Sequence, residues 1–522
     1  MRCALRCYPR RRANMSEERR RLHPLSSIFL LGGTLKEIAL PLAAVLFLGR
    51  HESYWEIGAA VPVLGVGIWA ILRARCFHYQ MGESELLVRE GVIDRTQRHI
   101  PFARIQGVSQ RRKLLHRLLG VTEVHIESAG GGKPEAVLKV LSLPAAAQLE
   151  MLLRGKSTGA TETATETVSG QSTEAASPVL HDLPAAEILR LGLVSNRGML
   201  MLGVVLGLIM PNQALRTSFG KLMLVPAQWA GRMMETQIAA GHTGLLALGV
   251  ALALLAAFVL LRVLSVLLAF FRYHGFTLTR DGERLLVQHG LLTVVRSSAR
   301  LPRLQRWELE ETWLHRRFGR CRLAVSVAGS THEHGHGTAP EASFSELAPI
   351  ATPAQAQALL RLCLPTLDWQ ALDWQALHPA MAKRRLFGQA RWVLPAMLAG
   401  GWADAAYSWP LPLPMLLGLY ALFALVMLWH ARAWARFAAI AQVGDVLLYR
   451  SGVWHRHWIV VVGTRLQNLR LYSSPLDRSL GMVHLQADTQ GGSRHHRALD
   501  IPCMPRDTAE TLRADLWRLI KL

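Results

Sequence analysis

The sequence is poor in acidic residues and in charged side chains overall. It has 37 Asp and Glu against 59 Lys and Arg, a formal net charge of +22, yet charged residues make up 18% of the chain. Nucleic-acid-binding proteins with so large a positive charge are usually richer in charge and poorer in apolar runs. Because 51% of the residues are hydrophobic, the composition indicates a membrane protein whose basic side faces anionic lipid. Nucleic acid is not an expected partner.

Cysteine is also scarce, which excludes several classes of site. The 522 residues contain six cysteines, and none has the paired spacing of a metal site. Scattered cysteines do not form a disulfide framework, and they fit a reducing compartment. Their positions are Cys3, Cys7, Cys76, Cys321, Cys363 and Cys503.

Catalytic motifs are missing as well. The sequence has no glycine-rich phosphate loop, no Gly-x-Ser-x-Gly, no His-Glu-x-x-His and no protein-kinase set of motifs. We therefore predict that the protein is not an enzyme and uses no cofactor.

Long apolar runs are prominent, and they come in pairs. A membrane-spanning helix needs about 20 mostly apolar residues. The first run must cross Lys36 and Glu37, and such adjacent charges are costly at mid-depth unless they are buried in a bundle or paired. The sequence predicts six helices, near 27–49, 55–73, 193–213, 243–271, 391–408 and 410–431.

Basic residues flank these pairs. Residues 1–24 carry eight arginines, and arginine follows each pair, whereas the turns within the first and third pairs are slightly acidic. Because Arg and Lys are retained on the cytoplasmic side, we expect both termini and the segments between pairs to be cytoplasmic. Residues 1–14 lack the apolar core of a signal peptide, and Met15 opens a more ordinary start, so Met15 is the expected initiator.

An internal repeat follows each helix pair. A Leu-Leu-Val-type run precedes a glycine, an Arg-x-Gln comes with its glutamine 15 residues later, and a second glycine follows after another 14. Three copies keep this spacing without a gap, so the repeating unit is two membrane helices and one soluble module. The signature positions are Gly91, Arg104, Gln106 and Gly120, then Gly290, Arg303, Gln305 and Gly319, then Gly452, Arg465, Gln467 and Gly481.

Each module has the pattern of a small α+β fold. The apolar run and its glycine predict a β-hairpin, short strands follow, and a helix-like stretch closes the module. The predicted fold class is therefore a multi-pass α-helical membrane protein with three small α+β modules, each a curved sheet or open barrel capped by a C-terminal helix.

These motifs resemble a known family. The Gly…Arg-Ile-Gln…Arg-x-x-Gly pattern, the Ser-Ala-Gly-Gly-Gly hairpin at 128–132 and the alternation with helix pairs are similar to the bacterial membrane-flanked PH domain family. This is the YdbS/YdbT-like group of membrane proteins, and the three modules match its YdbT-like members. The resemblance implies a pleckstrin-homology (PH)-like fold for each module and a place in the bacterial plasma membrane. It carries over no catalytic residue.

The third module departs most from the pattern, since Pro475 and Asp477 stand where the first has Leu114 and His116. The expected organisation is a basic cytoplasmic N-terminus at 1–26, helix pair 1 at 27–73, module 1 at 74–154, a disordered linker at 155–180, helix pair 2 at 181–272, module 2 with a His-rich insertion at 273–365, a juxtamembrane segment at 366–390, helix pair 3 at 391–436 and module 3 at 437–522.

Several side chains are binding candidates, each with a plainer alternative. The repeated Arg104, Arg303 and Arg465 either grip a lipid phosphate or carboxylate, or make a hydrogen bond or salt bridge that the fold needs. The basic residues next to the membrane either contact anionic headgroups, at about 1 kcal/mol each, or reflect topology alone. They are Arg111, Arg112, Lys113 and Arg117.

Alternating histidines in module 2 raise the question of a metal. His332, His334 and His336 could bind a transition metal, but four ligands are not in place and no cysteine is near in sequence. A solvated hairpin tip is the favoured interpretation, and no metal site is predicted.

The function predicted from these features is that of a non-enzymatic envelope scaffold. Its partners would be the lipid bilayer with its anionic headgroups, an unknown protein, or further copies of the chain. The alternative is a transporter or export component with a path through the six helices near Lys36 and Glu37. A transporter should place several polar groups at the midplane, and the other helices are apolar.

Overall fold

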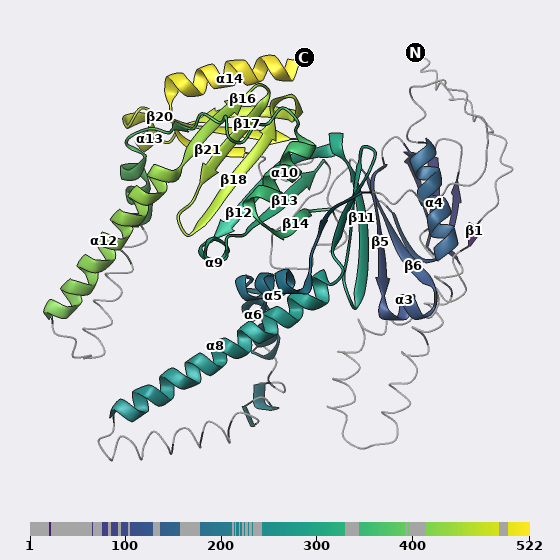
Figure 1. Ribbon diagram of the computed structural model, residues 1–522, viewed down its shortest axis with the longest axis horizontal. Helices are drawn as coiled ribbons and strands as arrows, with labels where there is room; N and C mark the ends of the chain where they lie inside the picture. The colour runs from purple at the N-terminus through teal and green to yellow at the C-terminus, as the bar shows by residue number, and fades with distance from the viewer. Residues whose placement is uncertain are drawn as a thin grey trace, which may run out of the picture. The chain divides into compact units, whose positions relative to one another are not determined.

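The structure is a computed structural model of the chain, shown in Figure 1. It describes residues 76–81, 85–91, 95–102, 105–128, 136–156, 178–210, 243–328, 344–391, 413–489 and 499–521, with scattered single positions elsewhere. Two compact units divide the chain. Unit 1 comprises Met1–Ala175, Val295–Arg300 and Gly329–Ser343, and unit 2 comprises Ala176–Val294, Leu301–Ala328 and Phe344–Leu522.

Unit 1 contains module 1, which is built from two antiparallel sheets and a closing helix. The first sheet has the order β1 (Arg20–Arg21), β2 (His78–Met81), β3 (Glu85–Glu90), β4 (Thr96–Pro101). The second continues from β5 (Ile105–Lys113) to β6 (Val121–Ser128) and β7 (Ala136–Ser142), with the short helix α3 (Leu114–Leu118) between β5 and β6. Helix α4 (Leu143–Lys156) closes the module.

Alternate residues of both sheets form the core of module 1. Leu86, Val88 and Ile100 come from the first sheet, and Ile126 and Leu138 from the second. Since successive side chains of a strand point to opposite faces, this alternation buries one face of each sheet, and Ala146 and Leu149 of α4 cover the core.

Unit 2 contains most of module 2 and all of module 3. Module 2 begins with the antiparallel strands β8 (Val179–Asp182), β9 (Thr277–Asp281) and β10 (Arg284–His289). Between β8 and β9 lie the helices α5 (Ala185–Val194), α6 (Arg197–Ile209) and α8 (Thr243–Tyr273). Strand β11 (Thr293–Arg300) follows, and its residues Val295–Arg300 belong to unit 1, where β11 neighbours β5.

The largest sheet of unit 2 joins the second half of module 2 to the first half of module 3. Its order is β14 (Glu346–Ala351), β13 (Cys321–Val327), β12 (Leu304–Thr312), β18 (His455–Val462), β17 (Val446–Ser451), β16 (Ala439–Val443), β15 (Gln375–Ala376). The short segments around β12 are η2 (Leu301–Arg303) and α9 (Trp313–Arg317), and α10 (Pro353–Cys363) closes module 2.

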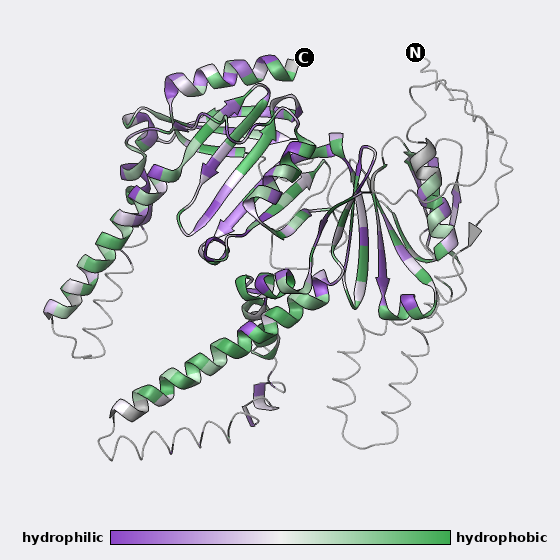
Figure 2. Cartoon of the chain, in the orientation of Figure 1, coloured by the Kyte–Doolittle hydropathy of each residue, from purple (hydrophilic) through white to green (hydrophobic). Residues whose placement is uncertain are grey.

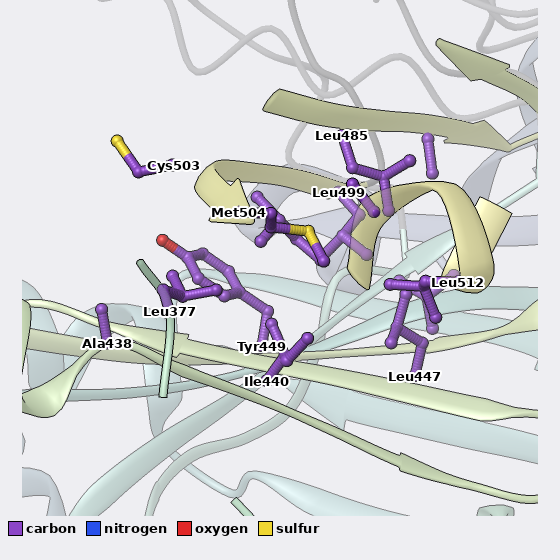
Figure 3. Packing of buried hydrophobic residues seen from close by; sticks show 14 of the residues in the cluster. Leu377, Ala438, Ile440, Leu447, Tyr449, Leu485, Leu499, Cys503, Met504 and Leu512 are labelled. Atoms are coloured by element: carbon purple, nitrogen blue, oxygen red, sulfur yellow. The ribbon is translucent and has the colours of Figure 1, made fainter. Parts of the chain in front are cut away.

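Module 3 ends in a second, three-stranded sheet. After η3 (Gly463–Arg465), the order is β19 (Leu466–Tyr472), β20 (Met482–Thr489), β21 (Leu499–Pro505), with α13 (Pro475–Ser479) between β19 and β20 and α14 (Arg506–Lys521) at the end. Figure 3 shows the core, where Tyr449 and Leu447 of β17 face Leu485, Leu499 and the helix residue Leu512. Modules 1 and 3 therefore share one plan of two sheets and a closing helix.

The prediction of a multi-pass α-helical membrane protein is wrong. Within the described residues, two helices are long and apolar enough to cross a membrane, Ala247–Tyr273 in α8 and Leu417–Phe437 in α12 (Leu413–Phe437). A third exists if the pair Ala185–Val194 and Arg197–Gly207, bent by 55°, counts as one span. The described chain also contains four β-sheets, which form the PH-like β modules.

The error has a physical cause in one of the predicted helices, and the bounds of another differ. The helix expected at 193–213 is instead broken at Ser195 and Asn196, where Ser265 of α8 donates from its hydroxyl to the Ser195 carbonyl at 2.8 Å. The helix expected at 410–431 begins later, at Leu413, and ends at Phe437. Mean hydropathy does not register such breaks. The expected helices at 27–49, 55–73 and 391–408 lie outside the described residues apart from a few single positions, and that at 243–271 is present as α8.

A hydrogen bond from Tyr273 joins α8 to a group of ion pairs in the sheet of module 2. At the end of α8, the Tyr273 hydroxyl donates to Oε2 of Glu346 at 2.6 Å, and Arg197 of α6 donates to the same hydroxyl oxygen at 2.5 Å. Arg322 of β13 donates to Oε1 of Glu346 at 2.6 Å and to Glu310 at 3.0 Å. The apolar helix is thus attached to the sheet through charged hydrogen bonds.

The signature glycines are needed for two different backbone reasons. Gly91, Gly290 and Gly452 follow β3, β10 and β17 with φ of 110°, 112° and 116°, and a Cβ at Gly452 would overlap the carbonyl oxygen of His455. Gly120, Gly319 and Gly481 follow the short helices with φ of 65°, 59° and 69° and have open space around them. Gly290 and Gly452 therefore need both the positive φ and the absence of a Cβ, whereas the second set needs the positive φ alone.

Alanine at these two kinds of glycine should therefore have unequal effects. We expect Gly452→Ala to lower the free energy of unfolding by about 2 kcal/mol and Gly481→Ala by about 1 kcal/mol. Pulse proteolysis of the full chain across a urea series measures both values. Equal losses at the two positions would contradict this account of the hairpin.

Candidate membrane-interface site

The C-terminal end of α12 changes from apolar to mixed aromatic and basic residues. Its apolar span gives way to Trp429, His430, Arg432, Trp434 and Arg436, and Figure 2 shows the same change in hydropathy along the ribbon. Trp and Arg are typical of the membrane–water interface, because each has an apolar body and a polar end. This end of α12 therefore marks the expected surface of the bilayer.

Two arginines from the first sheet of module 3 pack on the last residue of this helix. The Arg450 guanidinium lies 5.2 Å from the centre of the Phe437 ring, and its Nε donates to the Phe437 carbonyl at 3.0 Å. Arg456 lies 4.3 Å from the same ring, and Trp458 meets that ring edge-on at 5.5 Å. The Arg450 guanidinium also lies 4.4 Å from the centre of the Trp374 ring. We call Arg450, Arg456, Phe437, Trp458 and Trp374 the arginine–aromatic cluster.

The cluster holds more positive charge than its carboxylates balance. Burial and then the neighbouring Arg456 lower the pKa of Arg450, and burial and then Arg316 lower that of Arg456. Glu311 is the acidic group that faces Arg456, and burial raises its pKa. Nε of Arg456 is buried without a hydrogen-bond partner among the described residues. Such a site favours an anion that accepts hydrogen bonds, as a phosphate does.

The hairpin tip of module 3 lies beside α12 near this level. Trp454, at the tip, and Trp429 of α12 have ring centres 5.7 Å apart, and each is about half exposed, at 53% and 51%. Arg316 of α9 donates to the Val453 carbonyl at 3.0 Å, and α9 also exposes Trp313. The exposed aromatic rings are thus next to the helix that we expect to enter the membrane.

The signature arginine of module 3 and the signature glutamine of module 2 lie where these two modules meet. Arg465 donates to the carbonyl of Leu304 in module 2, and its guanidinium lies 5.4 Å from the Trp307 ring. Gln305, on the paired strand β12, is 6% exposed, whereas its equivalent Gln467 on β19 is exposed. This geometry favours the structural alternative for Arg465. Arg303 lies in η2, and Arg104 and the side chain of Gln106 are outside the described residues.

The predicted headgroup contacts lie together in unit 1, at the end of β5 and on α3. Arg111 and Arg112 are half-buried, and Lys113 and Arg117 are exposed. The same turn exposes large apolar side chains, at Leu114, Leu115 and Leu118. Basic and apolar residues on one turn suit a membrane surface, so their contact with headgroups stays a prediction.

Asp477, at which module 3 differs from the repeat pattern, forms part of a helix cap. Ser474 and Asp477 form a capping box at the start of α13, with Pro475 at the first turn, as Thr312 and His315 do for α9. The equivalent side chains His116, His315 and Asp477 are all buried. The hydrogen bonds of Asp477, which include one from Arg384 at 2.5 Å, outweigh its burial and lower its pKa to about 2.

One group of possible metal ligands occurs in the described residues, at the pairing of β12 and β18. Glu308, Glu310 and His457 have ligand atoms within 4.8 Å of one another. However, Arg306 lies 2.8 Å from Glu308 and Arg322 lies 3.0 Å from Glu310, so both carboxylates already have cationic partners. We assign no metal to this group. His332, His334 and His336, together with Lys36 and Glu37, lie outside the described residues.

Comparison with known proteins agrees with this repeated architecture. The family model described as "Bacterial PH domain" matches three times, at residues 27–157, 239–364 and 394–519. The chain belongs to the bacterial PH domain family. Among curated proteins, it is 24% identical over 364 residues to the "UPF0699 transmembrane protein YdbT" of Bacillus subtilis (strain 168), covering 67% of this chain and 70% of that protein. No solved structure matches the chain at a significant level.

These matches confirm the predicted family and its YdbT-like character. They also support a place in the membrane, since the relative is named a transmembrane protein and two described helices are apolar enough to span a bilayer.

Sequence reasoning missed Arg450 and Arg456 as members of a PH-module site. A signal was available, because these arginines stand two residues before and four after the hairpin glycine, as Arg89 and Arg95 do in module 1.

Proposed function

We propose that this bacterial PH protein is a non-enzymatic scaffold of the plasma membrane, whose modules face the cytoplasm and bind anionic lipid headgroups. The arginine–aromatic cluster at the end of α12 carries the proposal. Arg450 and Arg456 hold positive charge against aromatic rings at the helix end, where a lipid phosphate could accept hydrogen bonds from both guanidinium groups.

Charge around the helix ends supports the cytoplasmic orientation. Arg272 lies in the last turn of α8, and Arg432 and Arg436 lie in the last turns of α12. The acidic residues in the described spans are few, so the positive-inside tendency has no strong opposing term. Labelling of Arg518→Cys in intact cells should therefore fail, and labelling after permeabilisation should succeed.

A path for solute through the described helices receives no support from their charges. Arg262, within α8, donates to the carbonyls of Leu193 and Ser195 at 3.1 and 3.2 Å. A charge held by neighbouring backbone oxygens in this way is a structural contact. The scaffold is therefore the function that we propose, and transport is not.

Removal of the two cluster arginines should weaken binding of anionic lipid. Each basic residue near the surface contributes about 1 kcal/mol, so Arg450→Gln with Arg456→Gln should lower affinity for phosphatidylglycerol by about 2 kcal/mol, roughly thirtyfold. Native mass spectrometry of the full chain in neutral detergent, titrated with phosphatidylglycerol, measures the effect.

The matched control is the pair Arg513→Gln with Arg518→Gln on the exposed face of α14. It removes the same charge and should leave phosphatidylglycerol binding close to that of the parent chain. Phosphatidylcholine should bind equally to all three proteins. A cluster variant that still binds phosphatidylglycerol like the parent, or a control that loses as much, would refute the proposed site.

A further inference from the structure

Modules 2 and 3 are joined by the pairing of two strands. Strand β12, the first of the second sheet of module 2, runs antiparallel to β18, the last of the first sheet of module 3, over seven residue pairs from Arg306–Val461 to Thr312–His455. Figure 1 shows the two strands side by side in one sheet. The register can be stated by counting from the hairpin glycine of each module. Leu309, 19 positions after Gly290, pairs with Trp458, 6 positions after Gly452.

The equivalent strands of modules 1 and 2 are also neighbours. In unit 1, β5 lies next to β11, and the Ser298 hydroxyl donates to the Val108 carbonyl at 3.4 Å. Counted from Gly91 and Gly290, these are residues 17 and 8, the same positions as the Trp307–Val460 pair of β12 and β18. The chain therefore uses one strand-pairing rule twice.

The rule leaves one strand edge unused at each end of the series. Strand β4 of module 1 is equivalent to β11 and β18, and strand β19 of module 3 is equivalent to β5 and β12. In the sheets of the described chain, β4 has β3 as its one neighbour and β19 has β20. Unpaired edges present N–H and C=O groups that can pair with another strand.

Burial separates the used edges from the unused ones. Gln305 of β12 is 6% exposed, whereas its equivalent Gln467 is exposed. Val460 of β18 is 1% exposed, whereas its equivalent His99 of β4 is exposed. The two open edges thus lack the cover that the same positions have inside the chain.

We propose that β19 of one copy of this chain pairs antiparallel with β4 of a second copy. The repeat spacing sets the register, with Leu471 opposite Gln97, Arg470 opposite Arg98 and Leu469 opposite His99. The surfaces that meet are different ones, so the contact is head to tail and builds a ring if it closes or a linear array if it does not. The internal junctions supply the template, and a second copy supplies the complementary edge.

Disulfide trapping tests the register directly. Residues directly opposite in an antiparallel pair have Cα atoms about 4.5–5.5 Å apart, which a disulfide can bridge. Two full-length copies with different tags are co-expressed in membranes, both with their six native cysteines replaced. One copy carries Gln97→Cys and the other carries Leu471→Cys. We expect a mixed-tag disulfide dimer on mild oxidation.

The matched control replaces Leu471→Cys by Arg470→Cys, which moves the thiol one residue along β19 and therefore to its other face. The yield of mixed dimer should fall several-fold. Equal yields from the two pairs, or no mixed dimer from either, would each overturn the proposal.

Charge reversal tests the register independently, without introduced cysteines. The proposed register sets Arg470 against Arg98, and directly opposed like charges weaken a strand pair. Arg470→Glu should therefore tighten association about two- to fivefold, as 0.5–1 kcal/mol of cross-strand attraction would. Adding Arg98→Glu should reverse the gain. Energy transfer between labelled full-length copies in bilayers measures association, and an unchanged or weaker association of the single variant would contradict the register.

Discussion

Replacement of Glu346 by alanine is expected to lower the free energy of unfolding by about 3 kcal/mol, because it removes the more buried of the two carboxylates that pair with Arg322. The Glu346 side chain is 13% exposed and accepts hydrogen bonds from Arg322 and Tyr273, both at 2.6 Å. Burial alone would raise the pKa of Glu346, but the charge of Arg322, then those of Arg272 and Arg197, outweigh it and hold that pKa well below its usual range. The carboxylate is therefore ionised and contributes fully at neutral pH.

The measurement is pulse proteolysis of the full chain in mild detergent across a urea series. Glu310→Gln is the matched control, since Glu310 also pairs with Arg322, at 3.0 Å, but is 26% exposed. We expect it to cost less than about 1 kcal/mol, because this ion pair is more exposed to solvent than that of Glu346. The double change Glu346→Leu with Arg322→Met should cost less than Glu346→Leu alone, because it removes both charges. A double variant that is less stable than the single one would contradict this explanation.

Acidification from pH 7 to pH 4 is expected to lower the stability of module 2 by about 3 kcal/mol through one histidine, His315. His315 is 7% exposed, and its Nδ1 accepts from the backbone N–H and the hydroxyl of Thr312 at 3.3 and 2.9 Å. Burial, then the charges of Arg322 and His455, lower its pKa from 6.5 to about 4. Protonation would also turn the accepting Nδ1 into a donor and break the cap.

The direction of the pH effect follows from this lowered pKa. Between pH 6.5 and about 4, the unfolded chain binds a proton at His315 that the folded chain does not, so stability falls as the pH falls through this window. Above pH 6.5 both states are neutral at His315, and this residue then adds no pH dependence.

His315→Gln is the variant that isolates the effect. Glutamine already completes the same capping box at Thr352 and Gln355, so the cap should survive while the titration is lost. The difference in stability between pH 7 and pH 4.5, measured by pulse proteolysis, should be smaller in the variant by about 2–3 kcal/mol. A variant as sensitive to acid as the parent chain would disprove the role of His315. Module 3, with Asp477 at this position, should lack this particular sensitivity.

The two predictions concern the same part of unit 2, where α8 and α9 meet the sheet of module 2. Arg322 contacts Glu346 and also contributes to the lowered pKa of His315. Loss of the Glu346 carboxylate should therefore loosen the attachment between the apolar helix α8 and the module that follows it. For a membrane scaffold, this attachment would keep the module at a constant distance from the bilayer.

Several features could be predicted from local sequence because their causes are local. The hairpin glycines Gly290 and Gly452 have φ values that other residues rarely adopt, so the backbone itself requires glycine there. The capping residues Thr352 and Pro353 start α10 as their order predicts. Helix α8 is continuous where its apolar run is uninterrupted.

Other features could not be predicted because their partners are distant in the sequence. Arg450 and Arg456 meet Phe437 and Trp374 after β15, β16, β17 and β18 have aligned in one sheet. Similarly, mean hydropathy could not reveal the break at Ser195, which forms a hydrogen bond with Ser265 of α8, 70 residues away. The boundaries of the three modules and their cytoplasmic side stay predictions.

Repeat spacing, hairpin positions and family membership could thus be recognised from the order of residues, because backbone conformation and hydrophobic periodicity depend on near neighbours. The joining of β12 to β18 needed the folded chain. Hydrogen bonds between strand edges are made by the backbone, which is the same for almost every residue. The side-chain pattern of either strand therefore does not identify the strand that pairs with it. The effect of this pairing is seen at two equivalent repeat positions: Gln305, on the paired strand β12, is buried, whereas Gln467, on the unpaired edge β19, is exposed.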